Sequence, residues 1–227
     1  MKKRIQQQLL STKRITIFVG EFGSGKTELA VNYALYLQAN GYSTAIVDID
    51  IIKPYFRTRE TRDLLEAEGV QVIAPESRLA HADLPVLPQN LFPALHDSAR
   101  QVVMDVGGGE SSIALGQINT QLTAAGYEAL LVVNTCRPFT KTPEEIVETT
   151  SRIEQASKLR VTGLISNTNL ADDTNGELVQ KGLAITEEAA RLLHVAVRAV
   201  VVPEGLSTDF AIPVFVLKRY THYPWME

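Results

Sequence analysis

The most specific chemical pattern of the chain lies near its start, between Gly20 and Thr27. The segment reads Gly-Glu-Phe-Gly-Ser-Gly-Lys-Thr and fits the pattern G-x-x-x-x-G-K-[ST]. Its glycines let the backbone curl so that successive N–H groups face inward and surround a phosphate. Lys26 can then reach the β- and γ-phosphates of a nucleotide, and the Thr27 hydroxyl can bind Mg²⁺. The segment therefore predicts binding of a nucleoside triphosphate with magnesium.

Two further segments supply the carboxylates that a magnesium–nucleotide site needs. The apolar run 101–105 ends on Asp105, and three glycines follow at 107–109, which can offer a backbone N–H to the γ-phosphate. The run 45–48 ends on Asp48, and Asp50 lies two residues further on. If the strand continues, both side chains share one face, so one could hold the water shell of the metal and the other could orient an attacking water. The alternative for Asp105 is a turn-opening or helix-capping aspartate.

Strand and helix patterns alternate around these residues. The apolar runs at 15–19, 44–48, 70–73, 101–105, 129–133, 161–165 and 197–202 are typical of buried parallel strands. Helical patterns lie between several of them, at 26–40, 58–68, 111–125 and 143–158. A glycine follows each of the first three helical patterns, and Thr142-Pro143 opens the fourth. The alternation predicts an α/β fold with a doubly wound, mostly parallel sheet that carries helices on both faces.

Composition limits the class of protein. The chain has 227 residues, of which 45% are hydrophobic and 21% are charged, so we expect one nucleotide-binding domain over 1–227. The formal net charge of −4 argues against a general nucleic-acid-binding surface. No apolar run approaches the roughly 20 residues of a membrane-spanning helix. The single cysteine, Cys136, cannot form an internal disulfide, which favours a cytoplasmic location.

Three stretches carry weaker patterns. Residues 1–14 have basic residues but only two adjacent leucines, so we expect a frayed leader and no secretory signal. The proline-containing stretch 75–93 is the least regular and is expected to be a surface excursion. The end of the chain, 215–227, is interrupted by Pro224 and is expected to be a packed or frayed terminus.

Together these motifs resemble the MinD/ParA/CobQ/CobB family, an ATP-binding branch of the P-loop proteins of the SIMIBI class. In that family, residues at the positions of Asn167 and Pro203 contact the purine; the alternative is a turn-forming asparagine and a strand-ending proline. The resemblance implies ATP or ADP with Mg²⁺ as ligands. It covers nearly the whole chain through Gly20–Thr27, Asp48, Asp50, Asp105–Gly108, Asn167 and Pro203.

The candidate site residues form three groups. The catalytic candidates are Lys26, Asp48 and Asp50, and the metal-binding candidates are Thr27, Asp48 and Asp105. The candidates for contact with the nucleotide are Gly20, Gly23, Ser24, Gly25, Lys26, Thr27, Glu28, Gly107, Gly108, Asn167 and Pro203.

The sequence differs from related nucleotide-binding families at two positions, one of which bears on homodimer formation and the other on the choice between ATP and GTP. MinD and ParA proteins have a second lysine after the first glycine of the loop, which reaches a partner's nucleotide, whereas this chain has Glu21. A carboxylate there repels phosphate unless it faces away, so the nucleotide-sandwich homodimer is in question, although a homodimer as such stays open. The loop also resembles that of the metallochaperone GTPases related to UreG and HypB, which read guanine through N-K-x-D. Here the stretch 167–170 ends on Leu170 without that carboxylate, so ATP is expected over GTP.

Two functional classes follow from the resemblance. The first is an ATPase switch that binds MgATP, hydrolyses it slowly and changes its grip on an unidentified protein partner. The second is a biosynthetic ligase of the CobQ/CobB or dethiobiotin synthetase type, which passes the γ-phosphate to a small-molecule carboxylate. The short chain has no appended glutaminase domain, which favours the switch.

In a switch, residues 48–59 and 106–112 are expected to be coupled segments whose order depends on the γ-phosphate. Arg57 and Arg59 lie in the first of them, beside Tyr55 and Phe56. An arginine there can stabilise developing phosphoryl charge or bind a partner's carboxylate. In the alternative, the aromatic residues pack under the loop while the arginines stay solvated or pair with nearby carboxylates.

Overall fold

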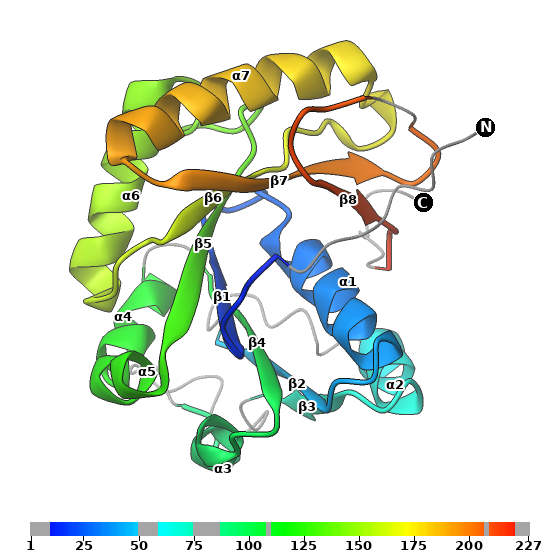
Figure 1. Cartoon of the computed structure of the whole chain (residues 1–227), viewed down its shortest axis with the longest axis vertical. Helices are drawn as coiled ribbons and strands as arrows, with labels where there is room; N and C mark the ends of the chain where they lie inside the picture. The colour runs from blue at the N-terminus through cyan, green and yellow to red at the C-terminus, as the bar shows by residue number, and fades with distance from the viewer. Residues whose placement is uncertain (1–9, 50–58, 75–86, 108–109, 207–208, 221–227) are drawn as a thin grey trace.

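The computed structural model describes residues 10–49, 59–74, 87–107, 110–206 and 209–220 (Figure 1). Two candidate site residues, Asp50 and Gly108, lie outside the described residues. The same is true of Arg57 and of most of the predicted switch segment 48–59.

The described part of the chain contains eight strands in a single sheet. They are β1 (Ile15–Val19), β2 (Thr44–Asp48), β3 (Gln71–Ile73), β4 (Gln101–Asp105), β5 (Tyr127–Val133), β6 (Gly163–Ser166), β7 (Ala196–Pro203) and β8 (Val214–Leu217). Their order is β3-β2-β4-β1-β5-β6-β7-β8, and every neighbouring pair is parallel. Parallel strands place all their carboxyl ends at one edge, so the loops that follow them converge there.

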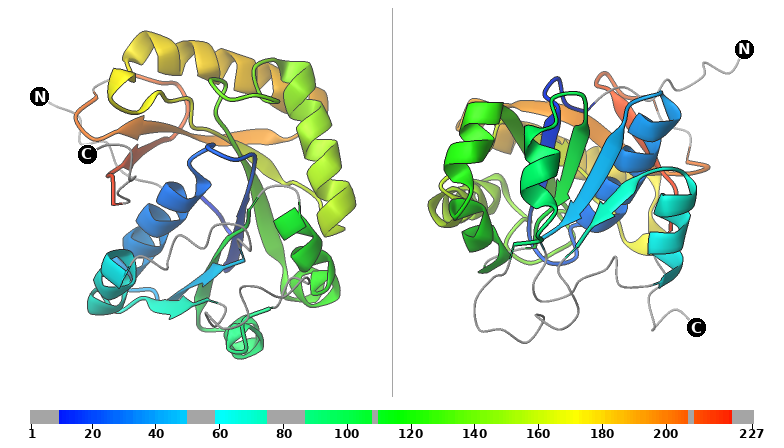
Figure 2. Two further views of the ribbon diagram at one scale, coloured as in Figure 1. Left: turned by 180° about the vertical axis from the view of Figure 1, so that it is seen from behind. Right: turned by 90° about the horizontal axis from the view of Figure 1, so that it is seen from below.

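Helices cover both faces of this sheet (Figures 1 and 2). They are α1 (Lys26–Ala39), α2 (Arg59–Ala67), α3 (Leu91–His96), α4 (Glu110–Gly116), α5 (Asn119–Ala125), α6 (Pro143–Ser157) and α7 (Gly176–Leu193). The core on one face contains residues of α1 and α2, and the core on the other contains residues of α3 to α7. Because the strands are buried on both faces, their sequences are nearly continuous in apolar residues. The predicted doubly wound α/β fold is thus confirmed.

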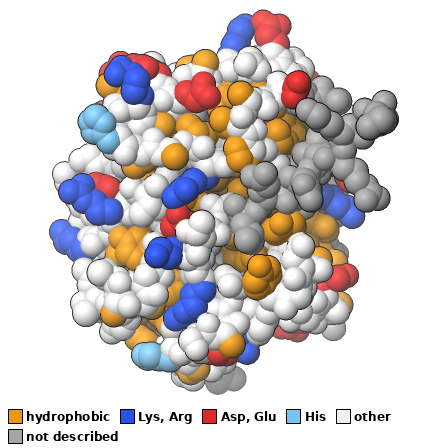
Figure 3. All heavy atoms as spheres, viewed as in Figure 1, with side chains coloured by type: hydrophobic (Ala, Val, Ile, Leu, Met, Phe, Trp, Pro, Cys, Tyr) orange, Lys and Arg blue, Asp and Glu red, His pale blue; other side chains and the backbone are white. Residues whose placement is uncertain are grey.

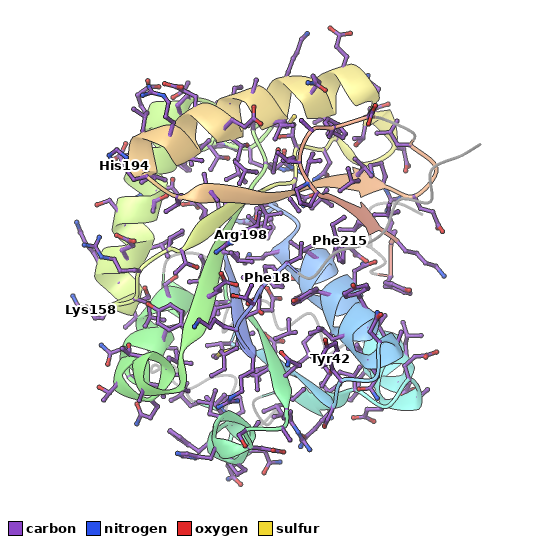
Figure 4. All side chains as sticks on the ribbon, viewed as in Figure 1. Phe18, Tyr42, Lys158, His194, Arg198 and Phe215 are labelled. Carbon is purple, nitrogen blue, oxygen red and sulfur yellow. The ribbon has the colours of Figure 1, made fainter. Side chains whose placement is uncertain are left out.

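An aromatic cluster holds the last strand against the first helix. Tyr33 on α1 lies edge-on to Phe18 of β1, with 5.8 Å between ring centroids, and to Phe215 of β8, with 6.3 Å. Tyr36 contacts Phe215 at 6.2 Å. Figure 4 shows Phe18 and Phe215 beside α1. Burial raises the pKa of Tyr33 to about 12, because the charged phenolate is disfavoured in the core. Strand β8 is therefore fixed to the helix that begins at Lys26.

Two elements of this region differ from the sequence-based prediction. The predicted helix 111–125 is two helices, α4 and α5, because the chain leaves helical geometry at Ile118, whose side chain is buried in the core. The short helix α3 begins at the end of the stretch 75–93 that was expected to be an irregular surface excursion, and residues 75–86 of that stretch lie outside the described residues. For the terminus 215–227, expected to be packed or frayed, the described residues agree with packing, because β8 contains the fully buried Phe215, while residues 221–227 lie outside the described part of the chain.

The longest helix, α7, was not predicted. Its start carries a recognisable signal, because the side chain of Asn175 accepts a hydrogen bond from the backbone N–H of Leu178 at 3.0 Å. Gly182 interrupts the apolar pattern in its interior, and a Cβ at that position would collide with Thr168. The glycine lets α7 approach the loop after β6 closely, which explains why a helix contains a residue that disfavours helices.

The leader is ordered where the structure describes it. Leu10 and Ser11 are buried, and the backbone N–H of Thr12 donates to the Glu128 carboxylate at 2.9 Å. Glu128 also forms an ion pair with Arg198 of β7. The expectation of a frayed leader is therefore wrong for residues 10–14, while residues 1–9 lie outside the described part of the chain.

The surface shows side chains of both charge signs. Figure 3 shows Lys, Arg, Asp and Glu side chains on the face seen in Figure 1. Several arginines of the chain are paired, including Arg100 with Asp97 at 3.3 Å and Arg160 with Glu154 at 3.0 Å. None of the helices in the described ranges has both the length and the apolar character of a membrane span.

Candidate nucleotide-binding site

The loop predicted to bind phosphate joins β1 to α1 at the carboxyl edge of the sheet. The backbone N–H of Ser24 donates to the carbonyl of Glu21 at 3.2 Å, which closes a turn within the loop. Gly25 caps α1 with a φ of 85°, in the left-handed region. A Cβ at Gly25 would also collide with the side-chain amide of Asn167, so two independent constraints require glycine there.

Three oxygen-bearing side chains meet beside this loop. The Thr27 hydroxyl donates to a carboxylate oxygen of Asp105 at 2.6 Å, and both residues are buried. Asp48 and Asp105 are register partners at the carboxyl ends of neighbouring strands β2 and β4, and each is only 1% exposed. A hydroxyl and two carboxylates are ligands that Mg²⁺ accepts, so the residues present fit this metal.

Other features of the loop also fit a phosphate ligand. Lys26 is the first residue of α1 and is 5% exposed. The buried Ser24 hydroxyl has no hydrogen-bond partner among the described residues. Those residues also contain no group of three or more His, Cys, Asp or Glu side chains that could hold a metal ion. A metal at Asp48 and Asp105 would therefore also rely on Thr27 and on the oxygens of a bound phosphate.

Asn134, which directly follows β5, links the phosphate loop to the loop after β6. Its amide nitrogen donates to the carbonyls of Gly23 at 3.4 Å and Asn169 at 3.1 Å. Its amide oxygen accepts from the backbone N–H groups of Cys136 at 3.0 Å and Asn169 at 3.2 Å. The side chain is fully buried. Sequence reasoning missed this residue, although an asparagine at the carboxyl end of a buried strand was a usable signal.

Asn167 contacts the same phosphate loop from the end of β6. Its amide nitrogen donates to the carbonyl of Ser24 at 2.7 Å, and its own backbone carbonyl accepts from the side chain of Asn169 at 2.8 Å. Asn167 is thus placed where it can brace the loop with its nitrogen and present its amide oxygen to a ligand.

Glu21, at the position of the family's second lysine, is held by an arginine. Its carboxylate lies 3.0 Å from the guanidinium of Arg152 on α6. Arg152 also donates to Thr149 at 2.9 Å and lies over the ring of Phe139, 5.4 Å from the centroid. The Glu21 carboxylate is therefore paired with a cation on the side of the loop that faces α6.

A cavity of about 590 Å³ lies next to the phosphate loop. Asn167 and Pro203 both line it, as the resemblance implied. Glu28 also lines it, but its carboxylate accepts a hydrogen bond from the backbone N–H of Tyr220. Leu170, at the place of the missing guanine-reading carboxylate, is 45% exposed and is not among the lining residues. Residues that sequence reasoning missed complete the lining, notably Asn169, Asp172, Glu204, Lys218 and Arg219.

The structure therefore brings most of the predicted site together. Lys26, Thr27, Asp48 and Asp105 gather at the phosphate loop. Gly107 directly follows β4, and its carbonyl lies 3.5 Å from the Ser112 hydroxyl. The predicted roles of Asp50 and Gly108 concern residues outside the described ranges.

Comparison with solved structures identifies the fold. FtsY from Mycoplasma mycoides is 20% identical over 86% of this chain and 61% of its own, with a TM-score of 0.53. Chloroplast FtsY from Physcomitrella patens is 19% identical over 91% of this chain and 66% of its own, with a TM-score of 0.57. The signal recognition particle 54 kDa protein from Aeropyrum pernix K1, solved with GDP, is 20% identical over 88% of this chain and 43% of its own, with a TM-score of 0.53.

This chain has the α/β P-loop NTPase fold. The likeness to FtsY and to the signal recognition particle 54 kDa protein shows this fold alone. The chain spans less than two thirds of the length of each of the three proteins above. No protein-family model matches the sequence, and no curated protein matches it either. The narrower likeness to MinD and ParA stays a hypothesis.

Proposed function

We propose that this chain is a nucleotide-dependent switch that binds a purine nucleoside triphosphate with Mg²⁺ and hydrolyses it slowly. The observation that carries the proposal is the buried hydrogen bond from Thr27 to Asp105, formed beside Lys26 at the carboxyl edge of the sheet. It joins the helix that begins the phosphate site to the strand end that supplies a metal carboxylate. A glycine-rich turn without a ligand has no need for this arrangement.

Each residue has a defined role in the proposed site. Lys26 and the N–H groups of the loop bind the terminal phosphates. Thr27, Asp48 and Asp105 hold Mg²⁺, which neutralises charge on the phosphate oxygens. Asp48 or Asp50 orients the attacking water. Because Glu21 replaces the family's second lysine, hydrolysis depends on a partner, on an arginine such as Arg57, or on both.

We also propose that ATP is preferred over GTP. The position of the guanine-reading carboxylate is occupied by Leu170, and Asn167 presents an amide oxygen that can accept from the amino group of adenine. The signal recognition particle 54 kDa protein from Aeropyrum pernix K1 was solved with GDP, so in that protein the ligand is a guanine nucleotide. A competition titration of ATP against GTP tests the preference. Equal affinities, or tighter binding of GTP, would move the protein toward the metallochaperone GTPase hypothesis.

Hydrogen exchange tests the switch itself. We expect a non-hydrolysable ATP analogue to protect the amides of 48–59 and 106–112 more strongly than ADP does, because only a ligand that distinguishes two states shifts their populations. Equal protection by both nucleotides would reject the switch and favour the small-molecule ligase. A pull-down with and without ATP would then search for the protein partner, whose capture should depend on the nucleotide.

A further inference from the structure

The end of the described chain is clamped to the helix that follows the phosphate loop. The side-chain amide of Asn32 on α1 donates to the carbonyl of Lys218 at 2.8 Å and accepts from the N–H of Lys218 at 2.9 Å. One side chain thus satisfies the backbone of Lys218 as a neighbouring strand would. One turn earlier, Glu28 accepts from the N–H of Tyr220. Both Asn32 and Glu28 are buried, so the clamp is part of the packed structure.

Part of this clamped segment, Lys218–Tyr220, also lines the cavity beside the phosphate loop. Lys218 and Arg219 line the cavity together with Asn167 and Asp172. The Arg219 guanidinium lies 3.0 Å from the carboxylate of Asp172, so an ion pair connects two parts of the lining. The terminal segment therefore touches both the phosphate-binding helix and the place proposed for the base.

Resting on the proposed function, we propose that Lys218–Tyr220 is the base-recognition wall of the site and that Arg219 determines base specificity. Arg219 engages Asp172, a carboxylate in the lining that could otherwise read guanine. The guanine edge presents two adjacent donors, N1–H and N2–H, which a carboxylate accepts together. The adenine edge presents the N1 lone pair beside its amino group, which a carboxylate repels in part. Because the ion pair with Arg219 occupies the Asp172 carboxylate, guanine loses the two hydrogen bonds that would favour it over adenine.

The specificity test uses Arg219→Gln in the full chain, with ATP, GTP and inorganic tripolyphosphate as separate probes. Arg219 is partly exposed and its ion pair contributes little to stability, so the variant should fold normally. We expect the affinity for GTP relative to ATP to rise roughly threefold to fivefold. Binding of tripolyphosphate, which has no base, should not change. Arg191→Gln, which breaks an exposed pair with Glu188 on α7, is the matched control and should leave all three affinities unchanged.

Two double variants identify the carboxylate. Adding Asp172→Asn to Arg219→Gln should abolish the gain in GTP affinity relative to ATP. Adding Glu204→Gln instead, which changes another lining carboxylate, should leave that gain unchanged. If the affinity for GTP relative to ATP is unchanged in Arg219→Gln, or if its gain persists without Asp172, the inference on base specificity is overturned. The proposed function is not affected by either result. If the wild type binds none of the three probes, the proposed function fails and the inference fails with it.

A second pair of variants tests the wall. Tyr220→Pro removes the N–H that donates to Glu28, whereas Tyr220→Ala keeps that N–H and removes only the side chain. We expect Tyr220→Pro to lower the affinity for ATP several-fold more than Tyr220→Ala does. The affinity for tripolyphosphate should be unchanged in both variants. Equal ATP affinities in the two variants, or an equal loss for tripolyphosphate, would show that the segment does not act on the base.

Discussion

The two sides of the proposed site are held in different ways. On the phosphate side, Thr27, Asp48 and Asp105 are buried and lie on central elements β2, β4 and α1. On the base side, the ion pair of Asp172 and Arg219 is largely exposed, and the lining combines loop residues with residues of α1, β7 and β8 and of the segment after β8. A buried lysine, and a metal ion held by buried carboxylates, attract phosphate strongly, whereas an exposed ion pair changes affinity only weakly. Changes to the buried phosphate-side residues should therefore weaken nucleotide binding strongly, and changes on the base side should shift the selectivity between ATP and GTP.

The largest expected effect comes from Lys26→Ala. Lys26 is the one side-chain cation that the phosphate loop itself contributes, so its loss should weaken nucleotide binding by roughly a hundredfold. Calorimetry with MgATP measures the effect, and circular dichroism checks that the fold is intact. Lys181→Ala, an exposed lysine on α7, is the control. Binding within a few-fold of the wild type would place the nucleotide elsewhere.

Asn134→Ala should break the link between the two sides. It leaves the N–H and the carbonyl of Asn169, and the N–H of Cys136, without their partners in a partly buried place, while the Gly23 carbonyl keeps its hydrogen bond from Arg137. The free energy of unfolding should therefore fall by about 2 kcal/mol. Urea denaturation measures this, with the exposed Asn40→Ala as control. If the free energy of unfolding matches that of the control, Asn134 does not brace the site.

Asp105→Asn should act through the metal. The wild type is expected to bind ATP more tightly with Mg²⁺ than with a chelator, and the variant should lose this difference, roughly tenfold in affinity. Paired titrations with and without Mg²⁺ measure it. Asp97→Asn, a carboxylate just before β4 that pairs with Arg100, should keep the full difference. A variant that still responds fully to Mg²⁺ would exclude Asp105 as a ligand.

The smallest effect is expected from Arg152→Gln. Losing this exposed pair should change the free energy of unfolding by less than about 1 kcal/mol. It leaves Glu21 without its cation in the phosphate loop, so ATP affinity should fall about threefold through repulsion. Adding Glu21→Gln to Arg152→Gln should restore the ATP affinity. Arg160→Gln, which breaks the ion pair with Glu154, is the control and should leave the ATP affinity unchanged. No recovery in the double variant would argue against this explanation.

The phosphate side and most of the sheet could be predicted because local chemistry dictates residue type there. A loop that surrounds phosphate needs glycines, a lysine and a hydroxyl in a fixed order. Buried parallel strands need continuous apolar runs. By contrast, α7 was missed because Gly182 interrupts its apolar pattern, and the glycine is explained only by contact with Thr168.

The base side could be predicted only in part because its contacts join distant residues of common types. Asp172 and Arg219 are 47 residues apart in sequence, and Glu28 and Tyr220 are 192 residues apart. Nothing in the local pattern around any of them indicates the pairing. The resemblance implies that Asn167 and Pro203 contact the base, and the structure places both in the lining of one cavity together with Lys218 and Arg219.

The most direct test of the central claim is a crystal structure of the full chain with a non-hydrolysable MgATP analogue. We predict terminal phosphates within hydrogen-bonding distance of Lys26 and the loop N–H groups, with the metal at Thr27 and Asp105. The base should occupy the cavity between Asn167 and Arg219. Phosphates bound away from the loop, or a base outside this cavity, would contradict the account.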